Sequence, residues 1–270
     1  MLTPAQEHFQ RVMAQRAGLS PEQDSPVERT AHEQVLHMLR LAQSRLSGIQ
    51  SRQTKAELKK EILPQFAGWI EGTLEGDRGR PDEVITTLMV WAVDCGDLTM
   101  ALRLGAYVVR HGLSLSDNFG RSAATTLTEE ICNPVLTLAT TQPDADLHDY
   151  IAPLDTLADI VDGQDMPDEV RAKLCKARAF ARRADEDQNS MALSLELLRT
   201  AMQLNPNAGV KREIAALTRA LKKLPDQSAA ESVPTTTDAP PATSRKTTRT
   251  KTASKTASKT KDAGKAKKNT

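Results

Sequence analysis

The sequence predicts an all-α protein made of antiparallel helical hairpins and followed by a basic C-terminal tail. Along most of residues 1–225 the apolar residues recur at spacings of three and four, as they do on one face of an α-helix. No run alternates with the period of two that marks a half-buried strand. From Asp226 onward the large apolar side chains almost disappear. This segment cannot bury enough surface to offset the entropy of ordering, and we expect it to be disordered.

Two helices are expected in the N-terminal region. The first follows from an apolar stripe at spacings of four and three, which consists of Val35, Leu39, Ala42, Leu46 and Ile49. The second is expected to begin at Thr54, because Thr54 followed by Glu57 has the spacing of a capping box. Pro64 has no backbone N–H for the helical ladder, so it should end or kink this helix.

The centre of the fold is expected to be a hairpin of two helices. The segment "RPDEVITTLMVWAVDCGD" opens with Pro81 and two acids, which suit the first turn of a helix, and it closes at Gly96. Its apolar residues cover nearly every face, which indicates a buried helix. The next segment, "DLTMALRLGAYVVRHG", is also apolar on two faces. The short "CGD" turn between them favours an antiparallel pair.

Further helices are expected over residues 122–140, 147–161, 168–185, 190–204 and 209–224. The segment "SLELLRTAMQLNP" has the spacing of the second helix of a tetratricopeptide repeat. A second unit at the repeat period is missing, so a generic helical hairpin is the preferred interpretation.

The net charge of +1 conceals a strong asymmetry along the chain. Residues 226–270 contain ten Lys and Arg against four Asp and Glu, whereas the other residues contain 26 basic and 31 acidic ones. Such an asymmetry favours an interaction tail. We expect the cations of this tail to contact DNA phosphates, and they are Arg245, Lys246, Arg249, Lys251, Lys255, Lys259, Lys261, Lys265, Lys267 and Lys268. The alternatives are a solubilising terminus and a segment that binds an acidic protein.

A second basic region lies within residues 1–60, which hold nine basic residues against six acids. If one helix runs through this region, four basic side chains form a single stripe and Lys60 lies beside it. The four are Arg45, Arg52, Lys55 and Lys59. The stripe is either a solvated face or a helix that contacts phosphates.

The segment between Arg121 and Arg171 lacks Lys and Arg and contains eleven acids. Most of these acids are expected at helix starts and turns, where Asp caps unpaired N–H groups. A functional acidic patch is the alternative. In either case phosphate would be repelled, so this face is not expected to meet DNA.

Motifs for catalysis are missing from the sequence. There is no GxxxxGK[ST] loop for phosphates, the five histidines are scattered, and the adjacent acid pairs are typical of first helical turns. The fragment Glu57–Leu58–Lys59 matches an acid-x-Lys nuclease element, but such elements normally lie on strands. No metal ligands and no cofactor are predicted, although Mg²⁺ would be needed if the chain were a nuclease.

The other compositional signals favour a protein of a reducing compartment. Cys95, Cys132 and Cys175 are widely spaced and are expected to be buried free thiols. The sequence shows no signal peptide and no window that is apolar enough to span a membrane.

Three blocks of the sequence carry a family resemblance. They are "KKEILPQFAGWIEGTL", "DEVITTLMVWAVDCGDLTMALRLGAYVVRHGLSLSDNFGRSAATTLTEEI" and "LLRTAMQLNPNAGVKREIAALTRALKK". With them the chain resembles, over roughly residues 30 to 224, the small terminase subunits of temperate tailed phages of the peduovirus type, which package DNA with cohesive ends. The resemblance implies binding of concatemeric double-stranded phage DNA at its cohesive-end site in the host cytoplasm. It also implies partnership with a large ATPase subunit and the prohead, self-association into a ring, and no membrane.

The resemblance leaves the catalytic role open, because the family is often described as the endonuclease subunit and no catalytic residue can be assigned here. Three hypotheses therefore stand: a DNA-binding packaging initiator, an endonuclease with an unrecognised metal site, and a tetratricopeptide-like adaptor whose tail contacts an acidic partner. For the first we expect residues 1–60 to bind DNA, residues 61–225 to form the core for oligomerisation and partner binding, and residues 226–270 to tether DNA.

Two apolar stripes are candidate seams for self-association. One is the stripe from Val35 to Ile49, and the other comprises Val210, Ile214, Leu217, Leu221 and Leu224. Packing within one subunit is the alternative use of both stripes.

Overall fold

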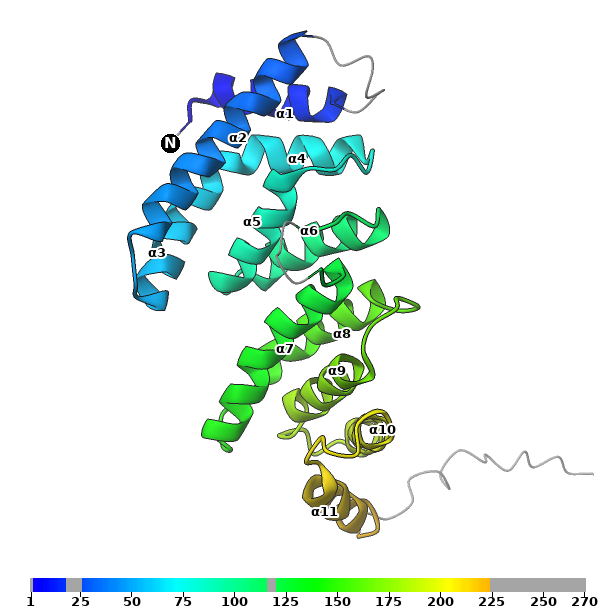
Figure 1. The fold of residues 1–270 in the computed structure, drawn as a ribbon. Coiled ribbons are helices and arrows are strands. Elements are labelled where there is room, and N and C mark those ends of the chain that lie inside the picture. Colours follow the sequence, from blue (N-terminus) through cyan, green and yellow to red (C-terminus); the bar gives the residue numbers. More distant parts are fainter. Residues whose placement is uncertain (1, 18–25, 116–119, 224–270) are drawn as a thin grey trace, which may run out of the picture. The chain divides into compact units, whose positions relative to one another are not determined.

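The computed structural model describes residues 2–17, 26–115 and 120–223, and every regular element in these ranges is a helix (Figure 1). The all-α prediction is thereby confirmed. Met1–Pro225 forms one unit, so the N-terminal helices share a core with the rest of the described chain. The expected disorder of residues 226–270 concerns a segment outside the described residues. Among the described helices, none is long and apolar enough to cross a membrane.

Helix α1 (Pro4–Arg16) packs against α4 (Ala67–Gly76). The start of α1 is set by Thr3, whose side chain accepts a hydrogen bond from the Gln6 N–H while the Gln6 side chain accepts one from the Thr3 N–H. This capping box was present in the sequence, although the apolar pattern predicted neither α1 nor α4.

Helix α2 (Pro26–Ser47) buries most of the predicted stripe, since Val35, Leu39 and Leu46 are at most 6% exposed. The last member of the stripe, Ile49, lies beyond the end of α2 and is half-buried. Helix α3 (Arg52–Ile62) begins earlier than expected, and the prediction of Thr54 as its cap is wrong. Ser51 is the N-cap instead: its backbone is extended and its hydroxyl accepts a hydrogen bond from the Thr54 N–H. As expected, Pro64 ends the α-helix, and it lies in the first turn of the 3-10 helix η1 (Leu63–Phe66).

Helices α5 (Glu83–Asp94) and α6 (Leu98–Arg110) form the predicted hairpin. Asp82 and Asp97 cap the two helices, and Gly96 takes a φ of +76° in the turn between them, a conformation that favours glycine. Most of α5 is buried, as its apolar composition indicated.

The remaining helices lie within a few residues of their expected ranges. They are α7 (Ala123–Thr141), the short 3-10 helix η2 (His148–Tyr150), α8 (Ile151–Ile160), α9 (Asp168–Ala181), α10 (Gln188–Leu204) and α11 (Lys211–Leu221). Helix α9 packs against both α7 and α10, and α10 packs against α11 (Figure 1). Helix α11 is the last helix of the described chain, which ends two residues after it.

Candidate nucleic-acid interface

The N-terminal basic residues are divided between two helices. Helix α2 ends at Ser47 and α3 begins at Arg52, so Arg45 lies on a different helix from Lys55 and Lys59. The premise that one helix runs through this region is wrong, because Ser51 caps a new helix. The sequence spacing therefore does not define a single stripe, and DNA binding by these residues stays a prediction.

The members of this basic group differ in their exposure. Arg45, Arg52 and Lys60 are exposed, while Lys55 is half-buried. These long side chains are available for contact with a phosphate backbone, which needs only accessible positive charge.

Lys59 has a different environment from its neighbours. Its ammonium group forms an ion pair with Asp94 of α5 and lies 5.7 Å from the centre of the Trp91 ring. The Lys59 side chain is only 13% exposed. These contacts join α3 to α5, so Lys59 contributes to the packing of the fold, and a phosphate would have to compete with Asp94 for it.

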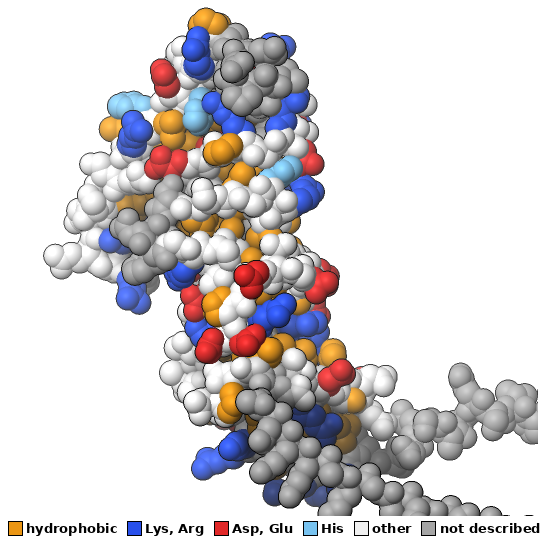
Figure 2. Space-filling view, turned by 45° about the vertical axis from the view of Figure 1, so that its right-hand side comes forward, with side chains coloured by type: hydrophobic (Ala, Val, Ile, Leu, Met, Phe, Trp, Pro, Cys, Tyr) orange, Lys and Arg blue, Asp and Glu red, His pale blue; other side chains and the backbone are white. Residues whose placement is uncertain are grey.

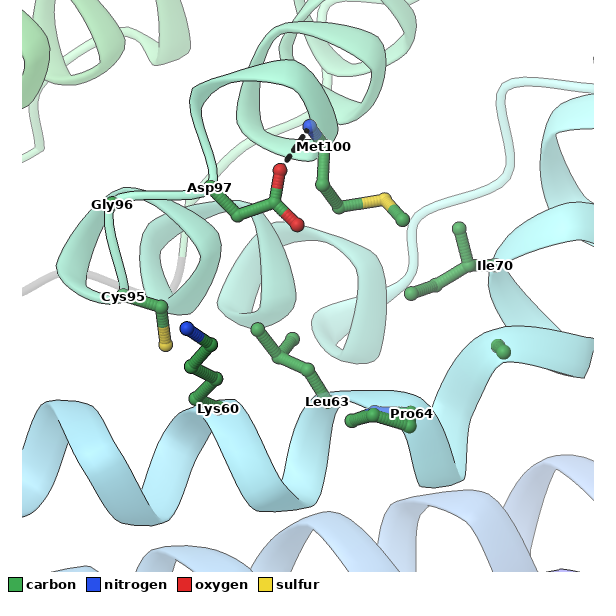
Figure 3. Close-up of a pocket in the computed structure, with 9 residues that line it drawn as sticks. Lys60, Leu63, Pro64, Ile70, Cys95, Gly96, Asp97 and Met100 are labelled. Atoms are coloured by element: carbon green, nitrogen blue, oxygen red, sulfur yellow. Dashed lines mark hydrogen bonds between the residues drawn. The ribbon is translucent and has the colours of Figure 1, made fainter.

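Lys60 lies at a cavity of about 460 Å³ between α3, η1 and the α5–α6 turn. Figure 3 shows its side chain pointing towards Cys95, with Leu63 and Met100 on the apolar wall. The carboxylate of Asp97, at the edge of the cavity, accepts a hydrogen bond from the Met100 N–H at 3.0 Å. Burial raises the pKa of the Cys95 thiol, although nearby Lys59 opposes this shift. The thiol is therefore protonated at neutral pH and is a weak nucleophile.

All three cysteines are free thiols, as predicted, but only Cys132 is fully buried, whereas Cys95 and Cys175 are half-buried. Burial raises the pKa of Cys132 to about 12.

The acids of the segment from Arg121 to Arg171 include several that hold helices together. Glu129 of α7 accepts hydrogen bonds from Lys173 at 2.8 Å and from Arg121 at 3.1 Å. Asp155 of α8 pairs with Arg178 of α9 and with Arg182, the residue that follows α9. Figure 2 shows acidic and basic side chains intermingled over the middle of one face. These ion pairs support the structural interpretation of the acidic segment.

Two of the adjacent acid pairs, Asp82–Glu83 and Asp168–Glu169, lie at helix starts and contain acids with structural roles. Asp82 is buried, and its carboxylate accepts hydrogen bonds from the Trp69 indole N–H and the Val84 N–H, both at 2.8 Å. Asp168 and Glu169 lie in the first turn of α9, where the helix dipole favours acids. In the described ranges, no three His, Cys, Asp or Glu side chains are grouped so that they could hold a metal ion.

A further group of basic residues was missed by the sequence analysis. Helix α11 and the two residues after it carry Lys211, Arg212, Arg219, Lys222 and Lys223, all exposed. The signal was the segment "VKREIAALTRALKK", in which basic and apolar residues fall on different sides of a helix. The ten predicted DNA-binding cations of the tail, from Arg245 to Lys268, lie outside the described residues.

Comparison with known proteins identifies the class of this helical chain. The family model described as phage small terminase subunit matches residues 36–169, which span α2 to the start of α9. The chain is also 35% identical over 227 residues to the "Terminase, endonuclease subunit" of Escherichia phage P2, an alignment that covers 84% of this chain and 88% of that protein. The chain therefore belongs to the phage small terminase subunit family, which confirms the resemblance and supports a role in phage DNA packaging. No solved structure matches the chain.

Proposed function

We propose that this protein binds concatemeric phage DNA at the cohesive-end site and directs the cut that starts packaging by the large ATPase subunit. The main support is the similarity to the phage P2 protein, which extends over most of both chains. The exposed cations in the N-terminal helices and the concentration of Lys and Arg in the tail add an electrostatic argument.

This function requires two kinds of DNA contact, one that supplies affinity and one that selects the end site. A strip of point charges attracts phosphates without reading sequence, so the tail would supply affinity and allow the protein to slide along DNA. Choice of the end site needs a folded element that reaches base edges or senses DNA shape. The N-terminal helices, with exposed Arg45 and Arg52, are the proposed element. The large subunit would then take over the bound DNA in the host cytoplasm and thread it into the prohead.

A second candidate is cleavage by this chain itself, and the name of the similar phage P2 protein favours it. A tetratricopeptide-like adaptor is the third, because α9, α10 and α11 pack as consecutive helices.

One experiment separates the three candidates. Purified full-length protein is incubated with linear duplex DNA that carries the end site, and with shuffled DNA of equal length, in the presence and absence of Mg²⁺. Preferential binding without cutting supports the packaging initiator. Mg²⁺-dependent cutting by the chain alone supports the endonuclease. Absence of binding to either DNA over a range of low salt concentrations would contradict both and favour the adaptor.

A further inference from the structure

We propose that the exposed face of α11 is a second DNA-docking surface, which contacts the phosphate backbone of a duplex. This inference rests on the proposed function and assigns a contact to residues outside the N-terminal helices and the tail. We call this surface the α11 basic face, and it consists of Lys211, Arg212, Arg219, Lys222 and Lys223.

The three cations within α11 share one side of the helix. Because an α-helix turns about 100° per residue, Lys211, Arg212 and Arg219 fall within an arc of about 100°. Lys222 and Lys223 follow directly after the last residue of the helix. The apolar residues Ile214, Leu217 and Leu221 fall roughly opposite, and Ile214 and Leu217 pack against the hydrophobic core. The charges thus face solvent while the other side of α11 holds it on α10. Figure 2 shows Lys and Arg side chains gathered at the end of the described chain where α11 lies.

The charge of this face is uncompensated within its own helix. Glu213 is the only acid from Lys211 to Lys223, which gives five positive charges against one negative charge. In the described part of the chain, none of the five cations is paired with a carboxylate, unlike Arg103 and Arg110 of α6, which pair with Glu71 and Asp77. Repulsion among close like charges costs free energy, and a polyanion would remove that cost.

The first turn of α11 gives an independent argument. Lys211 and Arg212 occupy the positive end of the helix dipole, where cations are unfavourable. The N-cap is Val210, which offers no side-chain hydrogen bond to the free backbone N–H groups. Neither feature serves the stability of the helix. An anion at this turn would be attracted by the free N–H groups and by the two cations, which outnumber Glu213, the acid of the same turn.

The dimensions suit a duplex. From Lys211 to Leu221 the helix rises by about 15 Å. A DNA duplex of that length carries about nine phosphate charges on its two strands, so several of these side chains can contact phosphates at once. A lipid surface fits less well, because basic amphipathic helices bind membranes by inserting their apolar face, and the apolar face of α11 is packed on α10.

The test is a salt titration of binding to duplex DNA by the full-length chain with Lys211→Gln, Arg212→Gln, Arg219→Gln and Lys222→Gln. Glutamine keeps the helix propensity of the cations it replaces. We expect the slope of log affinity against log salt to become shallower by about two to four, because each lost phosphate contact removes about 0.9.

Three further double variants control for misfolding and for the loss of net charge. Lys211→Glu with Arg212→Glu places acids where the helix dipole favours them, so thermal stability should be kept or raised while DNA affinity falls. Lys211→Gln with Arg212→Gln is compared with Arg103→Gln and Arg110→Gln, which remove the same net charge from cations that already have acidic partners. The α11 pair should change the slope more.

The outcomes separate this inference from the proposed function. If the wild-type chain binds duplex DNA and the four-residue variant has the same salt slope, the inference is wrong while the proposed function stands. An unchanged slope together with lost binding to the large subunit would overturn it in favour of a protein partner. No binding of duplex DNA by the wild-type chain would overturn the proposed function and the inference together.

Discussion

Asp82 and Asp97 occupy equivalent positions in the two helices of the central hairpin but have different surroundings. Each carboxylate caps its helix by accepting a backbone hydrogen bond, from Val84 in one case and from Met100 in the other. Asp82 is only 8% exposed and also accepts a hydrogen bond from the indole N–H of Trp69, whereas Asp97 is exposed. Although both residues are N-caps, Asp82 should therefore contribute more than Asp97 to the free energy of unfolding.

We predict that Asp82→Ala lowers the free energy of unfolding by about 2–4 kcal/mol. About 1 kcal/mol comes from the lost cap, and the rest from leaving a buried indole N–H without a partner. Asp97→Ala, the matched control, should cost only about 1 kcal/mol. Urea unfolding followed by circular dichroism measures both, and equal losses would contradict the role of the Trp69 contact.

A second prediction at the residue scale concerns Glu129 and pH. The hydrogen bond from Lys173, with a smaller contribution from Arg121, lowers the pKa of the Glu129 carboxyl group. A lowered pKa means that the carboxylate stabilises the fold above about pH 4.3, its ordinary value in an unfolded chain, and that this contribution is lost as the pH falls through the lower folded-state value.

Glu129→Gln should therefore destabilise the protein by about 1–3 kcal/mol at pH 7, and the difference from wild type should shrink towards pH 3. Glu130→Gln is the control, because Glu130 forms no ion pair within the described residues. A difference that stays constant from pH 7 to pH 3 would show that the ion pairs of Glu129 carry no stability.

Single residues also show where prediction from sequence failed. Ser51 and Thr54 are both good capping residues three positions apart, and the spacing of Thr54 to Glu57 could not reveal that Ser51 caps the helix. The residues near Lys59 in the sequence are mostly basic, and they gave no sign of its ion pair with Asp94, which lies 35 positions away. Such contacts depend on tertiary packing, which local patterns do not encode.

At the scale of elements, the packing of α1 on α4 depends on three glycines. Gly68, Gly72 and Gly76 recur every fourth residue of α4 and therefore share one face. A Cβ atom at Gly72 would lie 2.1 Å from the carbonyl oxygen of Arg11, and one at Gly68 would lie 2.3 Å from that of Glu7. The two backbones thus approach too closely for any side chain between them.

We predict that Gly72→Ala destabilises the protein by about 1–3 kcal/mol, since α1 must move away from α4 to make room. An alanine in an unobstructed helix would instead gain about 0.5–1 kcal/mol over glycine. Gly48→Ala, in the turn directly after α2, is the control for the added methyl group, because the nearest atom to its added Cβ is 3.8 Å away. Urea denaturation distinguishes the two, and a stabilised Gly72→Ala protein would refute the close approach.

The sequence was most informative about elements with a strong apolar period. It predicted α2, the α5–α6 hairpin and the helices from α7 to α11, because each presents a continuous apolar face. It missed α1 and α4, the first because the apolar pattern is weak and the second because interior glycines are unfavourable in isolated helices. The glycines are explained only by the neighbouring helix.

At the scale of the whole molecule, both stripes proposed as seams for self-association are at least partly used within the subunit. Val35, Leu39, Ala42 and Leu46 are buried in the core, and Val210, Ile214 and Leu217 pack against it. Leu224, the last member of the second stripe, lies outside the described residues. Self-association itself stays a prediction. Sedimentation of the wild-type chain at micromolar concentration should give an oligomer, and a monomer would contradict this prediction.

The last prediction separates affinity from site choice. Deleting residues 245–270 removes ten cations and one acid. If these cations track phosphates, non-specific affinity should fall and the slope against salt should become shallower by roughly three to six, because not all ten need contact DNA at once. Preference for the end site over shuffled DNA should survive, since diffuse charge carries no base information.

The complementary variant replaces Arg45, Arg52 and Lys55 by glutamine and leaves Lys59 in place, because its ion pair with Asp94 supports the fold. This variant should lose preference for the end site while keeping most of the slope that the tail contributes. Salt titrations of both variants on both DNAs test the pair of roles. An unchanged slope for the deletion would mean that the tail does not contact DNA, and lost preference on deletion would mean that the two roles are reversed.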